Sequence, residues 1–274
     1  MNPLPTLAVA TLMVSAVSAQ SLINSTNYSD LFSPPGNVTV DAPSPLLGLT
    51  LGGSASGPLG NYWSADATGG ASLSVLGLGV VDTGAQVSLS GNALEFNISN
   101  QPNTLLGALG TGASLSFGWS ATATFDQAGQ ELTLTPATIY QVSFDLMGND
   151  TLLSSTAGLL PSFGVELLDG AGNPIGSAGG DTLVDILGLS LLSPVVGNPV
   201  GDSRATVTFI TPSSVDSAPA SLRFTGDASL SATALGIGTN FATISNVNIT
   251  AVPEPSCMLL AFGAIPLFCT RRRR

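Results

Sequence analysis

The sequence contains no lysine and no histidine, and only 8% of its 274 residues are charged. These absences exclude a Ser-His-Asp triad, a Ser-Lys dyad, a Cys-His pair, a lysine Schiff base and a histidine zinc site. What remains is carboxylate chemistry of the kind a glycosidase uses. Glu95, Glu131 and Glu166 could take part with aspartates, but solvated carboxylates on turns and strands are the simpler interpretation. We therefore expect a protein that is not an enzyme.

Positive charge is scarce outside the last four residues. Only Arg204 and Arg223 face sixteen carboxylates between the two end segments, and the net charge of the whole chain is −11. Such a surface cannot neutralise a run of phosphates, so nucleic acid is not expected as a partner. Anionic lipid surfaces would repel it as well.

The sequence has two cysteines, Cys257 and Cys269, and both lie near its C-terminal end. In one helix they would be separated by about 18 Å, whereas a disulfide needs Cα atoms within roughly 7 Å. The rest of the chain therefore has no disulfide and no thiolate metal site.

The N-terminal end has the features of a secretion signal. An apolar stretch runs from Leu4 to Val17, and Val17-Ser18-Ala19 places small residues at the −3 and −1 positions before the polar Gln20. This pattern predicts a signal peptide over residues 1–19 with cleavage between Ala19 and Gln20. The first residues depart from it because they lack lysine and arginine. A buried N-terminal strand or helix is the alternative.

The C-terminal end has three parts in a fixed order. Val252 and the tripeptide Pro253-Glu254-Pro255 come first, an apolar run from Cys257 to Cys269 follows, and Arg271, Arg272, Arg273 and Arg274 end the chain. The prolines favour an extended backbone that a processing enzyme can bind. The apolar run would enter a bilayer, and the arginines would stay on the cytoplasmic side. A buried core strand is the alternative, which four consecutive arginines disfavour.

These residues resemble the PEP-CTERM tail of exosortase substrates. The resemblance implies a sorting tail at 251–274 with a short transmembrane segment, transient insertion into the inner membrane, and removal of the tail by an exosortase. Signal peptidase and exosortase would then be partners during export. The mature protein would go to the cell surface or the extracellular matrix of a bacterium that makes exopolysaccharide.

The membrane segment is short for a permanent anchor. Ser256 to Thr270 is 15 residues, or about 22 Å of helix, against a hydrocarbon core of about 30 Å. Pro266 also interrupts it, at the loss of a helical hydrogen bond. Both features suit a transient tail.

Between the ends, residues 20–250 form a body that we expect to be all-β, a jelly roll or β-sandwich, flanked by an N-terminal signal helix and a short C-terminal hydrophobic helix. Short segments with period-2 alternation are separated by Gly, Pro, Asn and Asp. The clearest are Ser72–Val81, Ala93–Ser99, Ser114–Phe125, Thr138–Met147, Phe163–Asp169, Ala205–Ile210, Ser221–Thr225 and Ala242–Thr250. Leu183–Leu192 could be a short helix or a buried strand.

The arrangement of these segments carries a second resemblance. Leu134–Leu146 is similar to a strand of galactose-binding-like jelly rolls, and Ser221–Thr250 is similar to their closing hairpin. In the first segment, Tyr140, Val142 and Phe144 are predicted to face the core with Leu146. Another kind of β-sandwich remains the alternative.

Calcium is the most plausible ligand of the oxygen-rich turns, although we assign no metal site or other cofactor. The candidate groups are Asp145 with Asn149 and Asp150, Asp169 with Asn173, and Asp181 with Asp185. None has the spacing of a known calcium loop. Turn residues that bond to their own backbone are the alternative at each position.

Tyr62 and Trp63 are the candidate sugar-binding residues, since an aromatic face can stack on a pyranose ring. They follow the glycine-rich stretch from Gly52 to Gly60 and are the aromatic pair most expected to be exposed, whereas Trp119 is expected in the core. Core packing is the default interpretation of all three.

The sequence thus predicts an exported, non-enzymatic protein of the cell surface or extracellular matrix, sorted through its C-terminal tail. A carbohydrate-binding module that adheres to exopolysaccharide is the first alternative, and a carboxylate glycosidase is the second.

Overall fold

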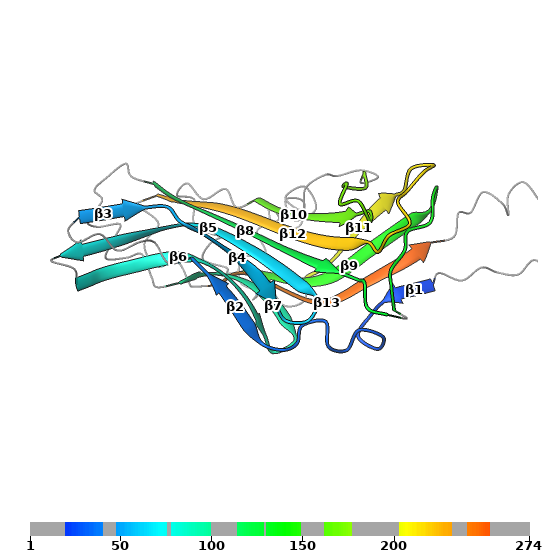
Figure 1. Ribbon diagram of the computed structural model, residues 1–274, viewed down its shortest axis with the longest axis horizontal. Helices are drawn as coiled ribbons and strands as arrows, with labels where there is room; N and C mark the ends of the chain where they lie inside the picture. The colour runs from blue at the N-terminus through cyan, green and yellow to red at the C-terminus, as the bar shows by residue number, and fades with distance from the viewer. Residues whose placement is uncertain are drawn as a thin grey trace, which may run out of the picture.

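The computed structural model describes residues 20–40, 48–75, 78–99, 114–128, 130–148, 162–176, 203–231 and 240–252. These residues form thirteen β-strands and no helix (Figure 1). The strands are β1 (Gln20–Ile23), β2 (Gly36–Thr39), β3 (Gly48–Leu51), β4 (Ser54–Leu59), β5 (Trp63–Val75), β6 (Leu78–Ser90), β7 (Ala93–Ser99), β8 (Ser114–Thr124), β9 (Ile139–Gly148), β10 (Ser162–Leu168), β11 (Ser203–Ile210), β12 (Ser221–Ser231) and β13 (Asn240–Val252).

The predicted all-β fold is therefore confirmed. The expected signal helix, the C-terminal helix and Leu183–Leu192 lie outside the described residues. Within the described part, no helix is long and apolar enough to cross a membrane.

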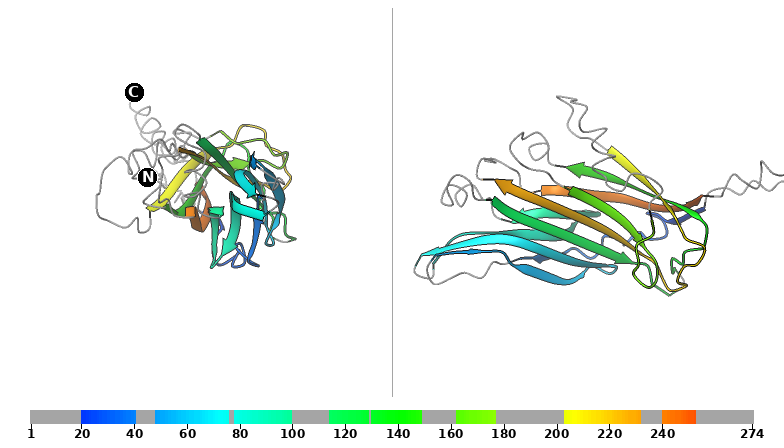
Figure 2. Two further views of the ribbon diagram at one scale, coloured as in Figure 1. Left: turned by 90° about the vertical axis from the view of Figure 1, so that its left-hand side faces the viewer. Right: turned by 90° about the horizontal axis from the view of Figure 1, so that it is seen from above.

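The strands pair antiparallel in the order β10-β12-β8-β5-β6-β7-β13-β9-β11, and the remaining four strands pair at its sides. This continuous sheet folds into two layers. The first layer contains β6, β7, β13, β9 and β11 with β1, β2 and β3. The second contains β8, β10, β12 and β4. The end-on view in Figure 2 shows the strands arranged around a common interior.

Strand β5 belongs to both layers. Its first half, from Trp63 to Gly69, pairs with β8, and its second half, from Gly70 to Val75, pairs with β6. The change occurs at two glycines, whose φ angles of 98° and 130° are unfavourable for residues with a side chain. The two glycines thus allow one strand to cross from one layer to the other.

The two ends of the strand order approach each other at one point. After β10 the chain turns back, and Ile175 N donates to Leu167 O. The next residue, Gly176, accepts a hydrogen bond at 3.3 Å from Ile210 N at the end of β11. The antiparallel sheet is therefore nearly closed.

The core lies between the layers and is rich in aromatic rings. Tyr140, Val142, Phe144 and Leu146 of β9 are all buried, as their alternation predicts. Phe144 contacts Phe224 of β12 edge-to-face at a centroid distance of 5.1 Å. Rings from opposite layers therefore pack directly on each other, which confirms the predicted sandwich.

Two features of the fold differ from the sequence-based expectation. Ser72–Val81 is not one strand, because Val75 pairs with Leu78 and the segment is the tip of the β5–β6 hairpin. The segment contains no proline, asparagine or aspartate that would indicate the reversal. The first four strands were not predicted either. They are four to six residues long, and β4 lies within the glycine-rich stretch.

The close approach at the layer change gives a stability prediction. A Cβ at Gly69 would lie 2.0 Å from Ser116 O, so Gly69→Ala requires a backbone shift. Gly52 also has a positive φ, of 84°, but has nothing within 4 Å of a Cβ. We expect Gly52→Ala to cost about 1–2 kcal/mol of unfolding free energy and Gly69→Ala about 1–3 kcal/mol more. Urea denaturation measures both, and equal losses would contradict the close-packing argument.

Candidate functional site

Tyr62 and Trp63 are core residues, as their default interpretation predicts, and the alternative that they form an exposed, sugar-binding pair is wrong. Tyr62 is 6% exposed and Trp63 is 3% exposed. The glycine-rich stretch before them is not an open loop but β4, which pairs with β5 from Ser54↔Thr68 to Leu59↔Trp63. Trp63 is the first residue of β5 and Tyr62 lies in the turn before it. Because both side chains are buried, neither ring offers a face to a sugar.

These two side chains hold the N-terminal part of the body in place. Trp63 Nε1 donates to Leu31 O at 2.7 Å, and Tyr62 OH donates to Asp30 Oδ1 at 3.0 Å. Burial raises the pKa of Tyr62 to about 12, and the hydrogen bond to Asp30 and its charge act in the same direction. These contacts hold the segment Asp30–Phe32 against the start of β5. The ring of Phe32 also stacks on the ring of Trp63.

The other large aromatic residues are buried too. All five tyrosine and tryptophan side chains of the sequence lie among the described residues, and none is more than 6% exposed. Their polar atoms are hydrogen-bonded inside the fold. Tyr28 OH donates to Gln130 O, Trp119 Nε1 donates to Asn97 O at 3.0 Å, and Tyr140 OH accepts from Thr135 N. No tyrosine or tryptophan ring is available as a stacking platform.

The structure does bring together two residues next to the predicted processing sites. Gln20, which follows the predicted signal cleavage, is the first residue of β1, and its antiparallel register partner is Ala251 of β13. Val252, the first residue of the predicted sorting motif, ends β13 and pairs with Ile139 of β9. We call the paired segments Gln20–Ile23 and Asn248–Val252 the terminal junction. They lie at the same end of the molecule (Figure 1).

The terminal junction is held on both faces of the sheet. On the outer face, Asn248 Oδ1 accepts from Ser21 Oγ at 3.0 Å and from Thr250 Oγ1 at 3.1 Å. On the inner face, Ile23 is buried in the core at 1% exposure. β9 flanks the other side of β13 over the same residues. The last residues of β13 therefore lie between two neighbouring strands.

The remaining predicted sorting residues are Ala19, Pro253, Glu254, Pro255, Arg271, Arg272, Arg273 and Arg274, and they lie outside the described residues. Sequence reasoning predicted the two processing sites separately and did not predict that the residues beside them are neighbours. The four residues of β1 are too few to show a period, and only the register with β13 reveals the contact.

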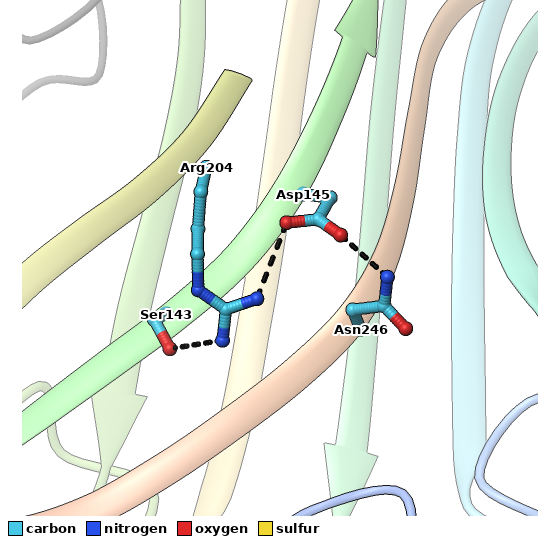
Figure 3. Close-up of polar contacts among 4 residues, drawn as sticks. All are labelled: Ser143, Asp145, Arg204 and Asn246. Atoms are coloured by element: carbon cyan, nitrogen blue, oxygen red, sulfur yellow. Dashed lines mark hydrogen bonds and ion pairs between the residues drawn. The ribbon is translucent and has the colours of Figure 1, made fainter. Parts of the chain in front are cut away.

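A second candidate is a row of polar side chains on the outer face of the first layer. The outer polar row comprises Ser143 and Asp145 of β9, Arg204 of β11 and Asn246 of β13 (Figure 3). Asp145 Oδ1 accepts from Arg204 Nη1 at 3.3 Å, and its Oδ2 accepts from Asn246 Nδ2 at 2.5 Å. Arg204 Nη2 donates to Ser143 Oγ at 2.9 Å. Arg204 and Asn246 are exposed.

Backbone geometry places Asn246 in this row. It has a φ of 51° and lies where the register of β13 against β9 shifts, between Ser245 and Asn248. Such a bulge turns an extra side chain toward one face of the sheet. A non-glycine residue at positive φ is uncommon, and asparagine tolerates it best. No residue pattern around Asn246 indicates this bulge.

The described calcium candidates have other roles. Asp145 is surrounded by donors, including a guanidinium, which are not calcium ligands. Asp169 accepts from Asn173 N at 2.8 Å and from Ala171 N at 3.0 Å, so it closes a turn. The backbone hydrogen bond from Asn173 is the main cause that lowers the pKa of Asp169. The described residues hold no group of three acidic, cysteine or histidine side chains suited to a metal. The candidates Asn149, Asp150, Asp181 and Asp185 lie outside the described residues.

The three body glutamates lie on separate elements. Glu95 of β7 accepts from Ser90 Oγ at 2.6 Å in the first layer. Glu166 of β10 forms an ion pair with Arg223 in the second layer. Glu131 lies between β8 and β9. The structure does not gather these three carboxylates in one place.

Comparison with known proteins gives structural likenesses only. No family model matches the chain, and no curated protein is similar to it. The Stig cyclase Fisc from Fischerella sp. TAU aligns over 86% of this chain and 100% of its own, with 17% identity and a TM-score of 0.34. A xylan-binding module, CBM15, aligns over 73% and 97%, with 11% identity and a TM-score of 0.32. TM-scores this low assign neither function to this chain.

The register at the terminal junction can be tested by cross-linking. We expect Gln20→Cys with Ala251→Cys to form a disulfide under mild oxidation, because paired antiparallel residues have Cα atoms about 5 Å apart. The background carries Cys257→Ser and Cys269→Ser. The control pair is Gln20→Cys with Thr243→Cys, since eight residues along β13 add about 26 Å. Mass spectrometry of the peptides identifies the bond, and a bond in the control pair alone would contradict the register.

Proposed function

We propose that this chain is an exported, non-enzymatic protein of the cell surface or extracellular matrix, and that an exosortase-type enzyme removes its C-terminal tail during sorting. One observation carries the proposal: Pro253-Glu254-Pro255, a short apolar run and four arginines stand in that order at the C-terminal end. A bilayer enzyme can read this order because each part would occupy a different depth, from the outer surface to the cytoplasm.

The geometry of β13 supports the proposal. The strand runs to Val252, so the tripeptide begins directly where the sheet ends. Pro253, the first residue of the tripeptide, lacks the N–H that a central strand must donate, so its chemistry is unsuited to extending β13. A motif that starts at the edge of a folded body leaves the body intact when the tail is removed.

The character of the body also fits a location outside the cytoplasm. Its outer faces carry serine, threonine, asparagine and glutamine. The body's arginines, Arg204 and Arg223, are each paired with a carboxylate. We propose signal peptidase and the exosortase as the partners during export, with exopolysaccharide around the mature protein.

Carbohydrate binding is a second candidate, and the outer polar row is the observation that favours it. A carboxylate, a guanidinium, an amide and a hydroxyl lie side by side there, and these groups bond to sugar hydroxyls. Because the tyrosine and tryptophan rings are buried, this binding would rest on hydrogen bonds rather than on stacking.

The sorting proposal is tested with the acidic residue of the motif. In an exosortase-bearing host we expect a fusion that carries residues 250–274 to lose its tail near Pro255. Glu254→Ala should block this cleavage, because the enzyme would lose the only charge of the tripeptide. Met258→Leu, a volume-conserving change in the apolar run, is the control and should be processed normally. Intact-mass measurement gives the result, and full processing of the alanine variant would count against the motif.

The binding candidate is tested with the two arginines of the body. If the body binds glycans through the outer polar row, Arg204→Ala should weaken binding about tenfold, the effect of one hydrogen bond worth about 1.4 kcal/mol. Arg223→Ala removes the matching ion pair on the other layer and should leave binding unchanged. Glycan-array screening and titration of the body measure both. Absence of binding by the unchanged body would eliminate this candidate.

A further inference from the structure

We infer from the terminal junction that the two processing steps are ordered: the signal peptide must be removed before the tail can be cut. This inference rests on the proposed function, since it concerns the same sorting tail. It adds a role for β1, whose pairing with β13 sets the two cleavage sites next to each other.

The register defines the distance between the sites. The predicted signal cleavage is at the bond before Gln20, whose partner Ala251 is about 5 Å away across the ladder. The tripeptide occupies the first to third residues after Val252, and a fully extended chain advances at most about 3.5 Å per residue. Both cleavage sites therefore fall within about 15 Å of one pair of residues.

The contacts at the terminal junction hold this arrangement. Ile23 anchors β1 in the core, and Asn248 accepts hydrogen bonds from Ser21 of β1 and Thr250 of β13. With β9 on its other side, β13 is fixed up to Val252. The start of the sorting motif therefore cannot move away from β1 without breaking pairs in the sheet.

Access then decides the order of cleavage. A processing enzyme with a folded domain of 100 residues would be about 30 Å across. That width exceeds the distance between the two cleavage sites. While the signal peptide remains attached, two membrane-directed segments leave the body at the same place. An enzyme that must close around the tripeptide would meet the retained signal segment. After the signal peptide is removed, Gln20 is the first residue of the chain. The enzyme can then reach the tripeptide from the side of β1.

The test uses the full chain in an exosortase-bearing host. Ala19→Phe places a large residue where signal peptidase requires a small one, and Ala19→Gly is the matched control that keeps a small residue. We expect Ala19→Phe to retain both the signal peptide and the tail, with tail removal reduced to the level of Glu254→Ala. The glycine control should lose both segments. Intact-mass measurement separates the four possible products.

A second variant tests whether proximity is the cause. A linker of about ten Gly and Ser residues between Val252 and Pro253 has a reach of roughly 17 Å and moves the motif away from β1. Combined with Ala19→Phe, it should restore tail removal while the signal peptide stays attached. In a chain that carries the linker but keeps Ala19, both cleavages should proceed as in the unchanged chain. Unchanged thermal unfolding of the body in Ala19→Phe establishes that the body is folded.

The outcomes separate this inference from the sorting proposal. A product of Ala19→Phe that keeps its signal peptide but lacks its tail would overturn the ordering. So would failure of the linker to restore cleavage in that variant. Retention of the tail by the unchanged chain would instead refute the sorting proposal itself, and with it the ordering, before any variant is compared.

Discussion

The fold depends on one set of contacts, the aromatic side chains buried between the two layers with every tyrosine and tryptophan polar atom hydrogen-bonded. Trp63 connects β5 to two other parts of the chain: it stacks on Phe32 and donates to Leu31 O in the N-terminal segment, and it contacts Phe224 of β12. Replacing one such ring by alanine typically costs about 3–5 kcal/mol, a large share of the stability of a domain. The two ion pairs of the body arginines cannot supply a comparable contribution, and the body sequence contains no cysteine for a disulfide. These same contacts fix the Asp30–Phe32 segment, and that segment follows β1.

How far the sequence predicts this structure depends on how local each signal is. The alternation in Thr138–Met147 identified the buried face of β9 because side-chain direction in a strand is set by the backbone alone. The alternation could not establish the burial of Tyr62 and Trp63, since the rings that contact them come from the N-terminal segment and from β12. Ser72–Val81 was misjudged for a related reason: small and apolar residues mix on both sides of the β5–β6 tip, and no proline, asparagine or aspartate marks the turn. Strand β1 has only four residues and owes its existence to β13.

The same distinction applies to the candidate sites. The sorting tail was predicted from residues that are adjacent in the sequence, so the order of its three parts can be read without a fold. The outer polar row could not be recognised, because Ser143, Asp145, Arg204 and Asn246 come from three strands separated by up to about a hundred positions and meet only through the register of β9, β11 and β13. The bulge at Asn246 is the decisive element, since a regular strand would not add an extra side chain to that face. The bulge depends on the backbone conformation of Asn246, which the residue pattern of the sequence does not indicate.

The ion pairs show why the outer faces are candidates for contact with sugars rather than with charged polymers. Arg204–Asp145 and Arg223–Glu166 are partly exposed pairs, and such pairs contribute at most about 1 kcal/mol to stability. Each arginine is compensated locally, so neither layer presents a positive field to an anionic polymer. Hydroxyl and amide groups, by contrast, remain available as donors and acceptors without a net charge. In Figure 1 the terminal junction lies at one end of the elongated body, and β3 with the tips of β5 and β6 lies at the other. If the body is delivered through its C-terminal tail, the membrane-proximal end is the terminal junction. The two polar faces then extend along the sides of the molecule toward its far end, where neighbouring polysaccharide could reach them.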